Sequence, residues 1–277
     1  MTTRSVGGVG GAGVVGLSVL ALLFLAVPVV GLVVRAVAGG AIVEAVTSPA
    51  VRDALVLSLA TTAVSLALVV IFGTPLALLL ARGTFRGSSV VESIVDLPIV
   101  LPPAVAGLAL LLMFGRSGVL GGALELAGIR IPFTTLAVVL AQTFVAAPFF
   151  IRTARTGISS VDRQLQDAAR DLGAEESSVF RRVTLPLAAP ALATGMVLCW
   201  SRALGEFGAT IMFAGNLPGV TRTLPLVVYS EFQSGDLEAS IAAAAILILA
   251  AFGVLVAVRR LRWGVTPTVR TGGIDRP

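Results

Sequence analysis

Residues 167–186 read DAARDLGAEESSVFRRVTLP, and this short stretch decides which fold the chain adopts. It is dense in charge, whereas the whole chain of 277 residues is 56% hydrophobic and only 13% charged. Soluble domains carry about 25% charged residues. The composition therefore indicates a membrane protein, and residues 167–186 form a polar segment between apolar stretches.

The apolar stretches on both sides of that segment are long enough to cross a bilayer. A spanning helix needs about 20 apolar residues, and hydrocarbon offers the backbone no other hydrogen-bond partners. The sequence predicts an all-α membrane protein with six transmembrane helices and one domain, 1–277. We expect spans at about 14–37, 54–81, 94–115, 131–153, 186–213 and 239–258, and a cytoplasmic segment at about 156–185.

The first apolar stretch has two interpretations, a cleaved signal peptide or a retained helix. Its charge-free core runs from Val14 to Val34. Signal-peptide cores have about 7–15 apolar residues, so the length of this core favours a retained helix.

The arginines predict the orientation of the bundle. All 20 basic residues are arginine, and with both termini in the cytoplasm fourteen lie inside and five outside, while Arg202 lies within a span. This is the bias of the positive-inside rule. The net charge of +5 could instead suggest nucleic-acid binding, but cytoplasmic loop arginines account for it. We expect a multi-pass protein of the cytoplasmic membrane with no nucleic-acid partner.

Several kinds of chemistry lack the residues that they need. The chain has no histidine and a single cysteine, Cys199, so His-based triads and His or Cys metal sites cannot be built. It also has no lysine and therefore no G-x-x-x-x-G-K-[ST] phosphate loop. We predict no catalytic residue, no metal and no cofactor on this chain, so an energy source has to come from another subunit.

Residues 161–176 have the pattern of a short amphipathic helix followed by a turn. Gly173 can adopt the left-handed conformation that ends a helix, and Glu176 suits the start of a second helix. The small apolar face of this helix has two possible uses. It could dock in a groove of a partner protein, or it could lie on the lipid surface. That face comprises Val161, Leu165, Ala168, Ala169 and Leu172.

The same residues resemble the cytoplasmic signature of ABC importer permeases. Asp-Ala-Ala at 167–169, Gly173 and Val-Thr-Leu-Pro at 183–186 follow the spacing of the family pattern, Glu-Ala-Ala, three residues, Gly, nine residues, Ile-x-Leu-Pro. The two departures, Asp for Glu and Val for Ile, are conservative. The resemblance implies a type I ABC importer permease architecture in which this segment is the coupling helix that docks in a cleft of the ATPase subunit. The implied coupling residues are Asp167, Ala168, Ala169, Leu172, Gly173, Leu185 and Pro186.

Charges occur inside the fifth predicted span. Arg202 and Glu206 are four residues apart, which would place them on one helix face. An arginine near mid-membrane costs about 3 kcal/mol on insertion scales, so such residues face the interior of a bundle. The pair is either part of a pathway or gate for a charged solute or a structural ion pair. Gly205 and Gly208 among these charges suit close packing or a narrow pore.

The third predicted span contains prolines, which remove backbone donors and disrupt helices. Pro98 is followed by Pro102 and Pro103. Irregular backbone at membrane depth is tolerated where protein or a water-filled cavity covers it. We interpret Pro102 and Pro103 as a bend near the translocation path, with a simple span-entry loop as the alternative.

Two longer stretches resemble the molybdate permease branch of the family. They are RALGEFGAT (202–210), followed by GNLPGVTRTLPL (215–226), and DLPIVLPPAVAGLALLLMFGRSGVLG (96–121). The resemblance implies ATP-driven import of molybdate, with tungstate possible and sulfate or thiosulfate as the alternative. It implies four kinds of partner: a second copy of the chain, two ATP-binding cassette subunits that use ATP and Mg²⁺, an extracytoplasmic oxyanion-binding protein and the lipid bilayer.

A function of a different class is an ion-coupled secondary carrier. An intramembrane carboxylate such as Glu206 could support proton coupling. The coupling signature and the absence of a repeat pair in the sequence argue against that class.

Overall fold

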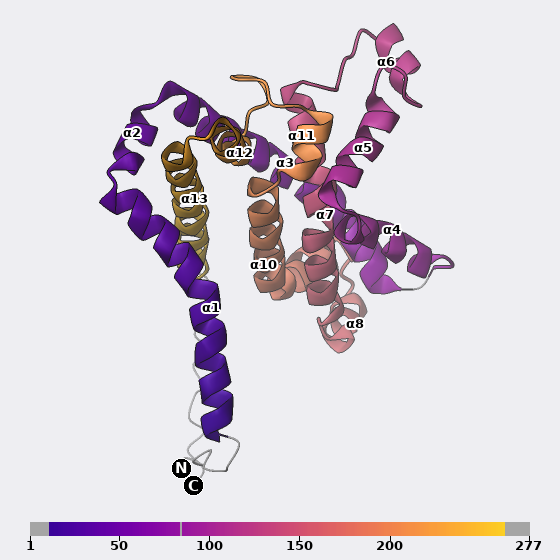
Figure 1. Ribbon diagram of the computed structural model, residues 1–277. Helices are drawn as coiled ribbons and strands as arrows, with labels where there is room; N and C mark the ends of the chain where they lie inside the picture. The colour runs from indigo at the N-terminus through magenta and orange to yellow at the C-terminus, as the bar shows by residue number, and fades with distance from the viewer. Residues whose placement is uncertain (1–10, 84, 264–277) are drawn as a thin grey trace.

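The computed structural model describes residues 11–83 and 85–263, and all regular secondary structure in them is helical (Figure 1). The helices are α1 (Gly11–Ala38), α2 (Ala41–Thr47), α3 (Pro49–Arg82), α4 (Ser88–Val100), α5 (Pro103–Phe114), α6 (Gly121–Leu126), α7 (Thr135–Ser159), α8 (Arg163–Asp171), α9 (Glu176–Val179), the π-helical turn η1 (Phe180–Thr184), α10 (Leu185–Leu204), α11 (Gly208–Phe213), α12 (Leu224–Ser234) and α13 (Leu237–Trp263). The expectation that both termini are cytoplasmic concerns chain ends that lie outside the described residues.

Five helices in the described part of the chain are long and apolar enough to cross a membrane. They lie at Gly13–Ala38, Pro49–Arg82, Thr135–Ser159, Glu176–Leu204 and Leu237–Val256. A sixth span results if α4 and α5 are counted together, although they meet at a bend of 116°. The all-α membrane fold predicted from composition is therefore confirmed.

The third predicted span, 94–115, is two helices in the structure. Residue Leu101 leaves the helical conformation, and α5 starts at Pro103. Pro102 and Pro103 have no backbone N–H to continue the hydrogen-bond ladder of α4, which explains the position of the break. The bend expected from these prolines is thus present, and the preceding helix begins at Ser88, earlier than expected.

The fifth predicted span, 186–213, is not one continuous helix in the structure. Helix α10 ends at Leu204, and α11 starts only at Gly208. Two glycines flank the gap, and glycine is unfavourable in helix interiors because it loses the most backbone entropy. The side chain of Glu206 also takes a backbone donor at the start of α11, since its Oε1 accepts from the Ala209 N–H at 2.7 Å.

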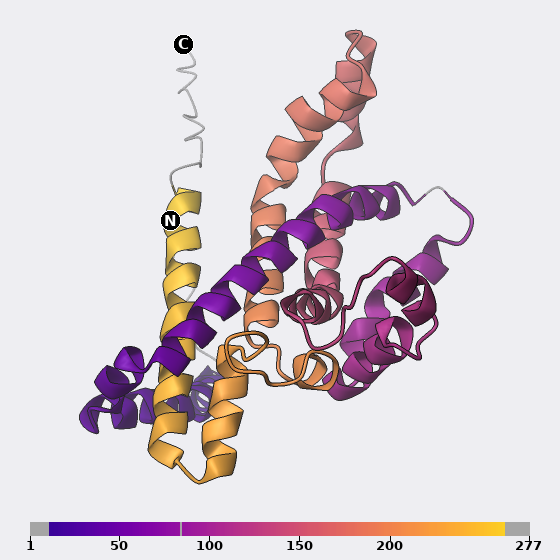
Figure 2. The ribbon, with the colours of Figure 1, turned by 90° about the horizontal axis from the view of Figure 1, so that it is seen from above.

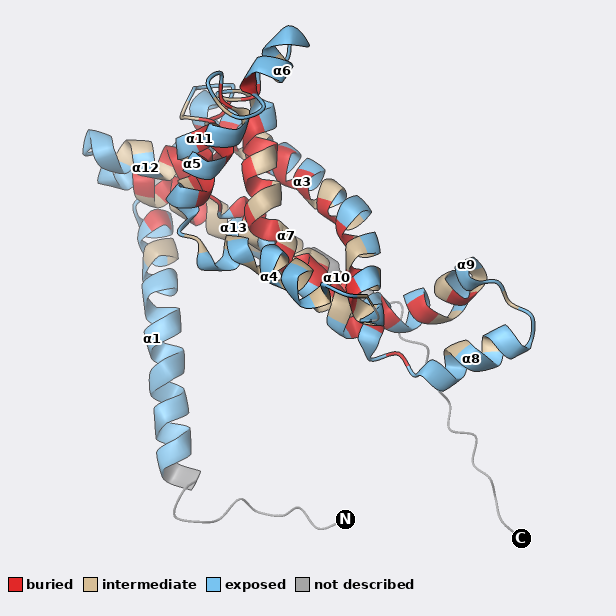
Figure 3. Cartoon of the chain, turned by 90° about the vertical axis from the view of Figure 1, so that its right-hand side faces the viewer, coloured by how far each residue is buried: buried red, intermediate tan, exposed pale blue. Residues whose placement is uncertain are grey.

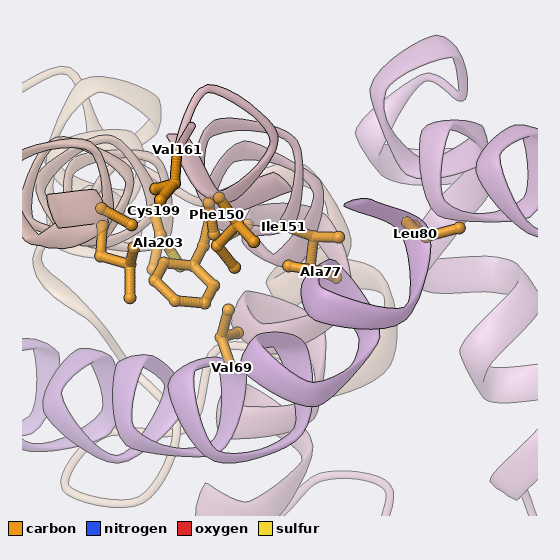
Figure 4. Close-up of a cluster of buried hydrophobic side chains, with 13 residues drawn as sticks. Val69, Ala77, Leu80, Phe150, Ile151, Val161, Cys199 and Ala203 are labelled. Atoms are coloured by element: carbon orange, nitrogen blue, oxygen red, sulfur yellow. The ribbon is translucent and has the colours of Figure 1, made fainter. Parts of the chain in front are cut away.

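Helices α3, α7 and α10 pack together and form the largest buried apolar cluster. Its labelled members, among them Val69 of α3, Phe150 of α7 and Cys199 of α10, converge between the three helices (Figure 4). Close approach of α7 and α10 depends on Gly195, where an added Cβ would lie 3.3 Å from the carbonyl oxygen of Phe150. Small residues at such crossings are typical of membrane helix packing.

The remaining long helices flank this bundle. Helix α3 runs obliquely across the molecule, from α2 at one edge to the connection with α4 at the other (Figure 2). Helix α13 packs against α12, α2 and α1. Helix α1 extends away from the bundle and is exposed along nearly its whole described length (Figure 3). Its apolar surface is therefore available for lipid or for another chain.

Candidate coupling and translocation sites

Helix α8 projects from one end of the bundle, away from α6, α11 and α12 (Figure 3). Its start is fixed by Asp162, whose carboxylate accepts a hydrogen bond from the Gln164 N–H at 2.9 Å. An acidic N-cap satisfies an amide that has no partner within the helix. The sequence pattern that predicted a short helix here is confirmed.

The turn after α8 depends on Gly173. This residue has φ 85°, in the left-handed region that glycine adopts without strain. The Gly173 N–H donates to the Arg170 carbonyl at 2.8 Å, and the Ala174 N–H donates to the Ala169 carbonyl at 3.0 Å. These two bonds form a Schellman motif. They reverse the chain between α8 and α9, as the sequence predicted.

Arg170 joins the two arms of the turn through Glu176 of α9, and also pairs with Asp167 on its own helix. Its guanidinium pairs with Asp167 and with Glu176, both at 2.6 Å, and Glu176 also pairs with Arg82 of α3 at 3.2 Å. The hydrogen bond from Arg170 lowers the pKa of the Glu176 carboxyl below its ordinary value, with a further contribution from Arg82. The segment is therefore tied to the end of α3 by charge.

The apolar face of α8 is only partly covered. Val161 is buried, whereas the side chains of Leu165 and Leu172 are exposed, Leu172 to 90%. A hollow of about 460 Å³ lies between this segment and the ends of α3 and α7. No described part of this chain covers Leu165 or Leu172, so the face is free to receive a partner.

The segment joins the membrane bundle through η1. The π-helical turn covers Phe180–Thr184, and α10 begins directly at Leu185, with Pro186 in its first turn. π-helical turns are rare and occur frequently at functional sites. All seven residues expected to couple to an ATPase thus lie between α8 and the start of α10.

The intramembrane charges lie at the other end of α10. Arg202 is in the last turn of α10, and Glu206 lies beyond the helix, in the gap before α11. Arg202 Nη1 and Glu206 Oε2 are 2.7 Å apart. The expected pair therefore exists, but the two residues do not share a continuous helix as the sequence suggested.

The break before α11 packs against the break before α5. A Cβ at Gly208 would lie 2.8 Å from the Cβ of Pro103, and one at Gly107 would lie 2.6 Å from the carbonyl oxygen of Ala209. The structure therefore brings Pro103 and Gly208 together next to the ion pair. Pro102 is exposed, and an added Cβ at Gly205 would make only an ordinary contact, 3.7 Å from the Ser201 carbonyl.

Sequence reasoning missed a buried polar stripe on α3. Ser58 accepts a hydrogen bond from the Leu224 N–H at 2.8 Å, and Ser65 donates to the Val139 carbonyl at 3.0 Å and lies 3.2 Å from Gln142 Oε1. The spacing of Ser58, Thr62 and Ser65 along one helix face was a visible signal, since polar residues within a span face protein.

The segment between α11 and α13 is partly buried. Its residues Leu224–Val227 are buried and form the first turn of α12. Asn216 links the loop after α11 to α12. Its side-chain amide donates to the Ser230 hydroxyl at 2.7 Å, and its side-chain oxygen accepts from Arg222 at 2.9 Å. The sequence signal was the apolar run inside the segment.

A family model described as "binding-protein-dependent transport system inner membrane component" matches residues 73–263. The chain belongs to this family. The match includes all of residues 156–185 and the helix breaks before α5 and α11. The prediction of an ABC importer permease is confirmed, and the chain is a multi-span inner membrane protein.

Individual relatives agree with this family assignment. The molybdenum transport system permease protein ModB of Mycobacterium tuberculosis is 42% identical over 234 residues, 84% of this chain and 88% of that protein. A probable sulfate transport system permease protein of Chlorella vulgaris is 40% identical over 67% of this chain and 70% of that protein. Among solved structures, a bacterial alginate importer aligns over 92% of this chain and 95% of that chain, with a TM-score of 0.73 and 18% identity. That likeness shows the fold.

Proposed function

We propose that this chain is the membrane-spanning subunit of an ATP-driven, binding-protein-dependent importer of molybdate. The observation that carries the proposal is the 42% identity to a molybdenum permease over 84% of the chain. Tungstate has nearly the same shape and charge, so it is included in the substrate class. Sulfate is the second candidate, supported by a relative that covers a smaller share of the chain.

In this proposal, the segment 156–185 is the coupling element. The exposed Leu165 and Leu172, together with Ala168, dock in a cleft of an ATPase subunit on the cytoplasmic side. The Arg170–Glu176 ion pair joins α8 to α9, so force on α8 is transmitted into α10. The ATPase supplies the bound ATP and Mg²⁺.

The translocation path is the second part of the proposal. Two copies of the chain form it, and an extracytoplasmic oxyanion-binding protein delivers the solute. Pro102 and Pro103, with Arg202, Gly205, Glu206 and Gly208, line the path or its gate. Support comes from α10 itself, which has the coupling segment at its first residue and the Arg202–Glu206 pair at its last turn. At 1.5 Å per residue, its 20 residues span about 30 Å.

The test is uptake into vesicles that contain this chain, its ATPase and its binding protein. ATP-dependent molybdate uptake that excess sulfate does not suppress is the expected result. Uptake of sulfate in place of molybdate would favour the second candidate substrate. Uptake driven by a proton gradient without the ATPase would show a secondary carrier and would contradict the coupling role of residues 156–185.

A further inference from the structure

Glu206 is a fully buried carboxylate that serves two groups at once. Its side chain is 1% exposed. Oε1 accepts a hydrogen bond from the Ala209 N–H at 2.7 Å, and Oε2 lies 2.7 Å from Arg202 Nη1. The second contact is an ion pair without the alignment of a hydrogen bond, so Oε2 has no hydrogen-bond partner among the described residues. A buried charge of this kind persists only where it is paired.

Arg202 is held less completely than its partner. The exposed fraction of the Arg202 side chain is 27%. Within the described residues, Glu206 is its ion-pair partner. A guanidinium has five N–H donors in a planar fork, and most of those of Arg202 have no acceptor in the part of the chain that the structure describes. An arginine in a span avoids lipid because of the cost of burying its charge in hydrocarbon. The exposed part of the Arg202 side chain therefore leaves unpaired N–H groups available to a ligand.

The pair lies where two broken helices meet. The gap before α11 packs on the start of α5 through Gly208 and Pro103. In membrane transporters, ligands bind at such breaks, because backbone groups there are released from the helix ladder. One turn further on, the Thr210 hydroxyl is buried without a hydrogen-bond partner among the described residues. The site thus offers a partly exposed guanidinium and one fixed counter-charge.

We propose that Arg202 contacts the oxyanion in transit and that Glu206 is a positioning residue that keeps this contact weak. This inference rests on the proposed function. A guanidinium binds tetrahedral oxyanions strongly through paired N–H donors. A carboxylate at 2.7 Å cancels the charge of Arg202 and competes with the solute. Passage requires binding that is strong enough to enter and weak enough to leave, and the counter-ion supplies the second condition.

The variant Glu206→Gln separates the charge from the structural role. Glutamine has the same size, and its amide oxygen can still accept from Ala209, whereas its charge is zero. In the purified complex of this chain with its ATPase, we expect radiolabelled molybdate to be retained at least about tenfold more tightly than in wild type, the effect of one charge-assisted hydrogen bond. ATP-driven uptake should slow in parallel. The double variant Arg202→Gln with Glu206→Gln should lose the added retention.

The matched control is Glu44→Gln, which removes an exposed carboxylate on α2 and should change neither retention nor uptake. If wild type imports no oxyanion with ATP, the proposed function fails. If wild type imports molybdate but Glu206→Gln behaves like Glu44→Gln, only this inference is overturned.

A second measurement uses the native chain, in case Glu206→Gln does not assemble. Millimolar molybdate should shift the side-chain ¹⁵N resonance of Arg202, identified by its loss in Arg202→Gln. An unchanged Arg202 resonance, in a complex that imports molybdate, would contradict the proposed contact.

Discussion

At the scale of single residues, Gly107 sets the distance between α5 and α11. An added Cβ there would lie 2.6 Å from the carbonyl oxygen of Ala209 and 2.8 Å from its Cα. Backbone atoms cannot move aside as a flexible side chain does, so Gly107→Ala forces the helices apart. We expect a loss of about 1–3 kcal/mol in the free energy of unfolding, the usual cost of overpacking.

Thermal unfolding of the purified chain in detergent checks this prediction. The control is Gly122→Ala in α6, where an added Cβ meets nothing within 4 Å and alanine is the better helix former. The control should melt at or above the wild-type temperature. Equal melting temperatures for the two variants would contradict the close packing of α5 and α11.

The Arg202–Glu206 pair gives a second prediction at this scale. Arg202→Ala leaves the Glu206 carboxylate buried without a cation, and breaking a buried pair costs about 3–5 kcal/mol. The double variant with Glu206→Ala removes the stranded charge and should recover part of that loss. Melting temperatures at matched expression measure both. A double variant that is as unstable as the single one would argue against a direct pair.

At the scale of elements, the sequence predicted which segments are helical better than where they end. Length and apolarity located the spans, because a bilayer imposes both. The end of α10 was missed because it depends on the tertiary contacts of Gly208 and on the hydrogen bond between Glu206 and Ala209. The buried start of α12 was not predicted, because the burial of Leu224 and Val227 depends on contacts with α3 and α13. Local chemistry at Gly173, in contrast, was readable from the sequence.

The turn between α8 and α9 should not form when residue 173 cannot adopt a left-handed backbone conformation. Proline fixes φ near −65° and has no N–H, whereas Gly173 has φ 85° and donates to Arg170. We expect Gly173→Pro to insert in the membrane and to lose ATP-dependent uptake. Gly173→Asn should retain most of it, because asparagine tolerates this conformation. Normal uptake by Gly173→Pro would exclude the turn as a coupling element.

The charge network of the coupling segment has a defined pH dependence. Hydrogen bonding from Arg170 lowers the pKa of Glu176 from its ordinary value of 4.5. A lowered pKa means that the pair stabilises the segment fully above pH 4.5, and that this stabilisation is lost as the pH falls through the lower, folded-state value. NMR titration of ¹³C-labelled glutamate should find Glu176 titrating below 4.5. In Arg170→Gln its pKa should rise, and an unchanged value would contradict the network.

At the scale of the whole molecule, α10 connects two polar sites across an apolar bundle. The coupling segment precedes its first residue, and the Arg202–Glu206 pair is at its last turn. The cluster of α3, α7 and α10 packs around its middle. Because close-packed interiors transmit displacement, motion of α8 relative to the bundle has a direct route to the helix breaks. This arrangement requires the two sites to face opposite sides of the membrane.

Thiol labelling tests that requirement and the predicted orientation together. On a Cys199→Ala background, Ser177→Cys places a thiol at an exposed position of α9, and Ser117→Cys places one at an exposed position between α5 and α6. If α8 and α9 are cytoplasmic, a membrane-impermeant reagent should label Ser117→Cys in intact cells and Ser177→Cys only in inverted vesicles. The arginine bias predicts this result, since positive charge is retained on the inner side. Labelling of Ser177→Cys from outside would show that the orientation is opposite to the predicted one. The ATPase-docking face would then lie where no ATP is available.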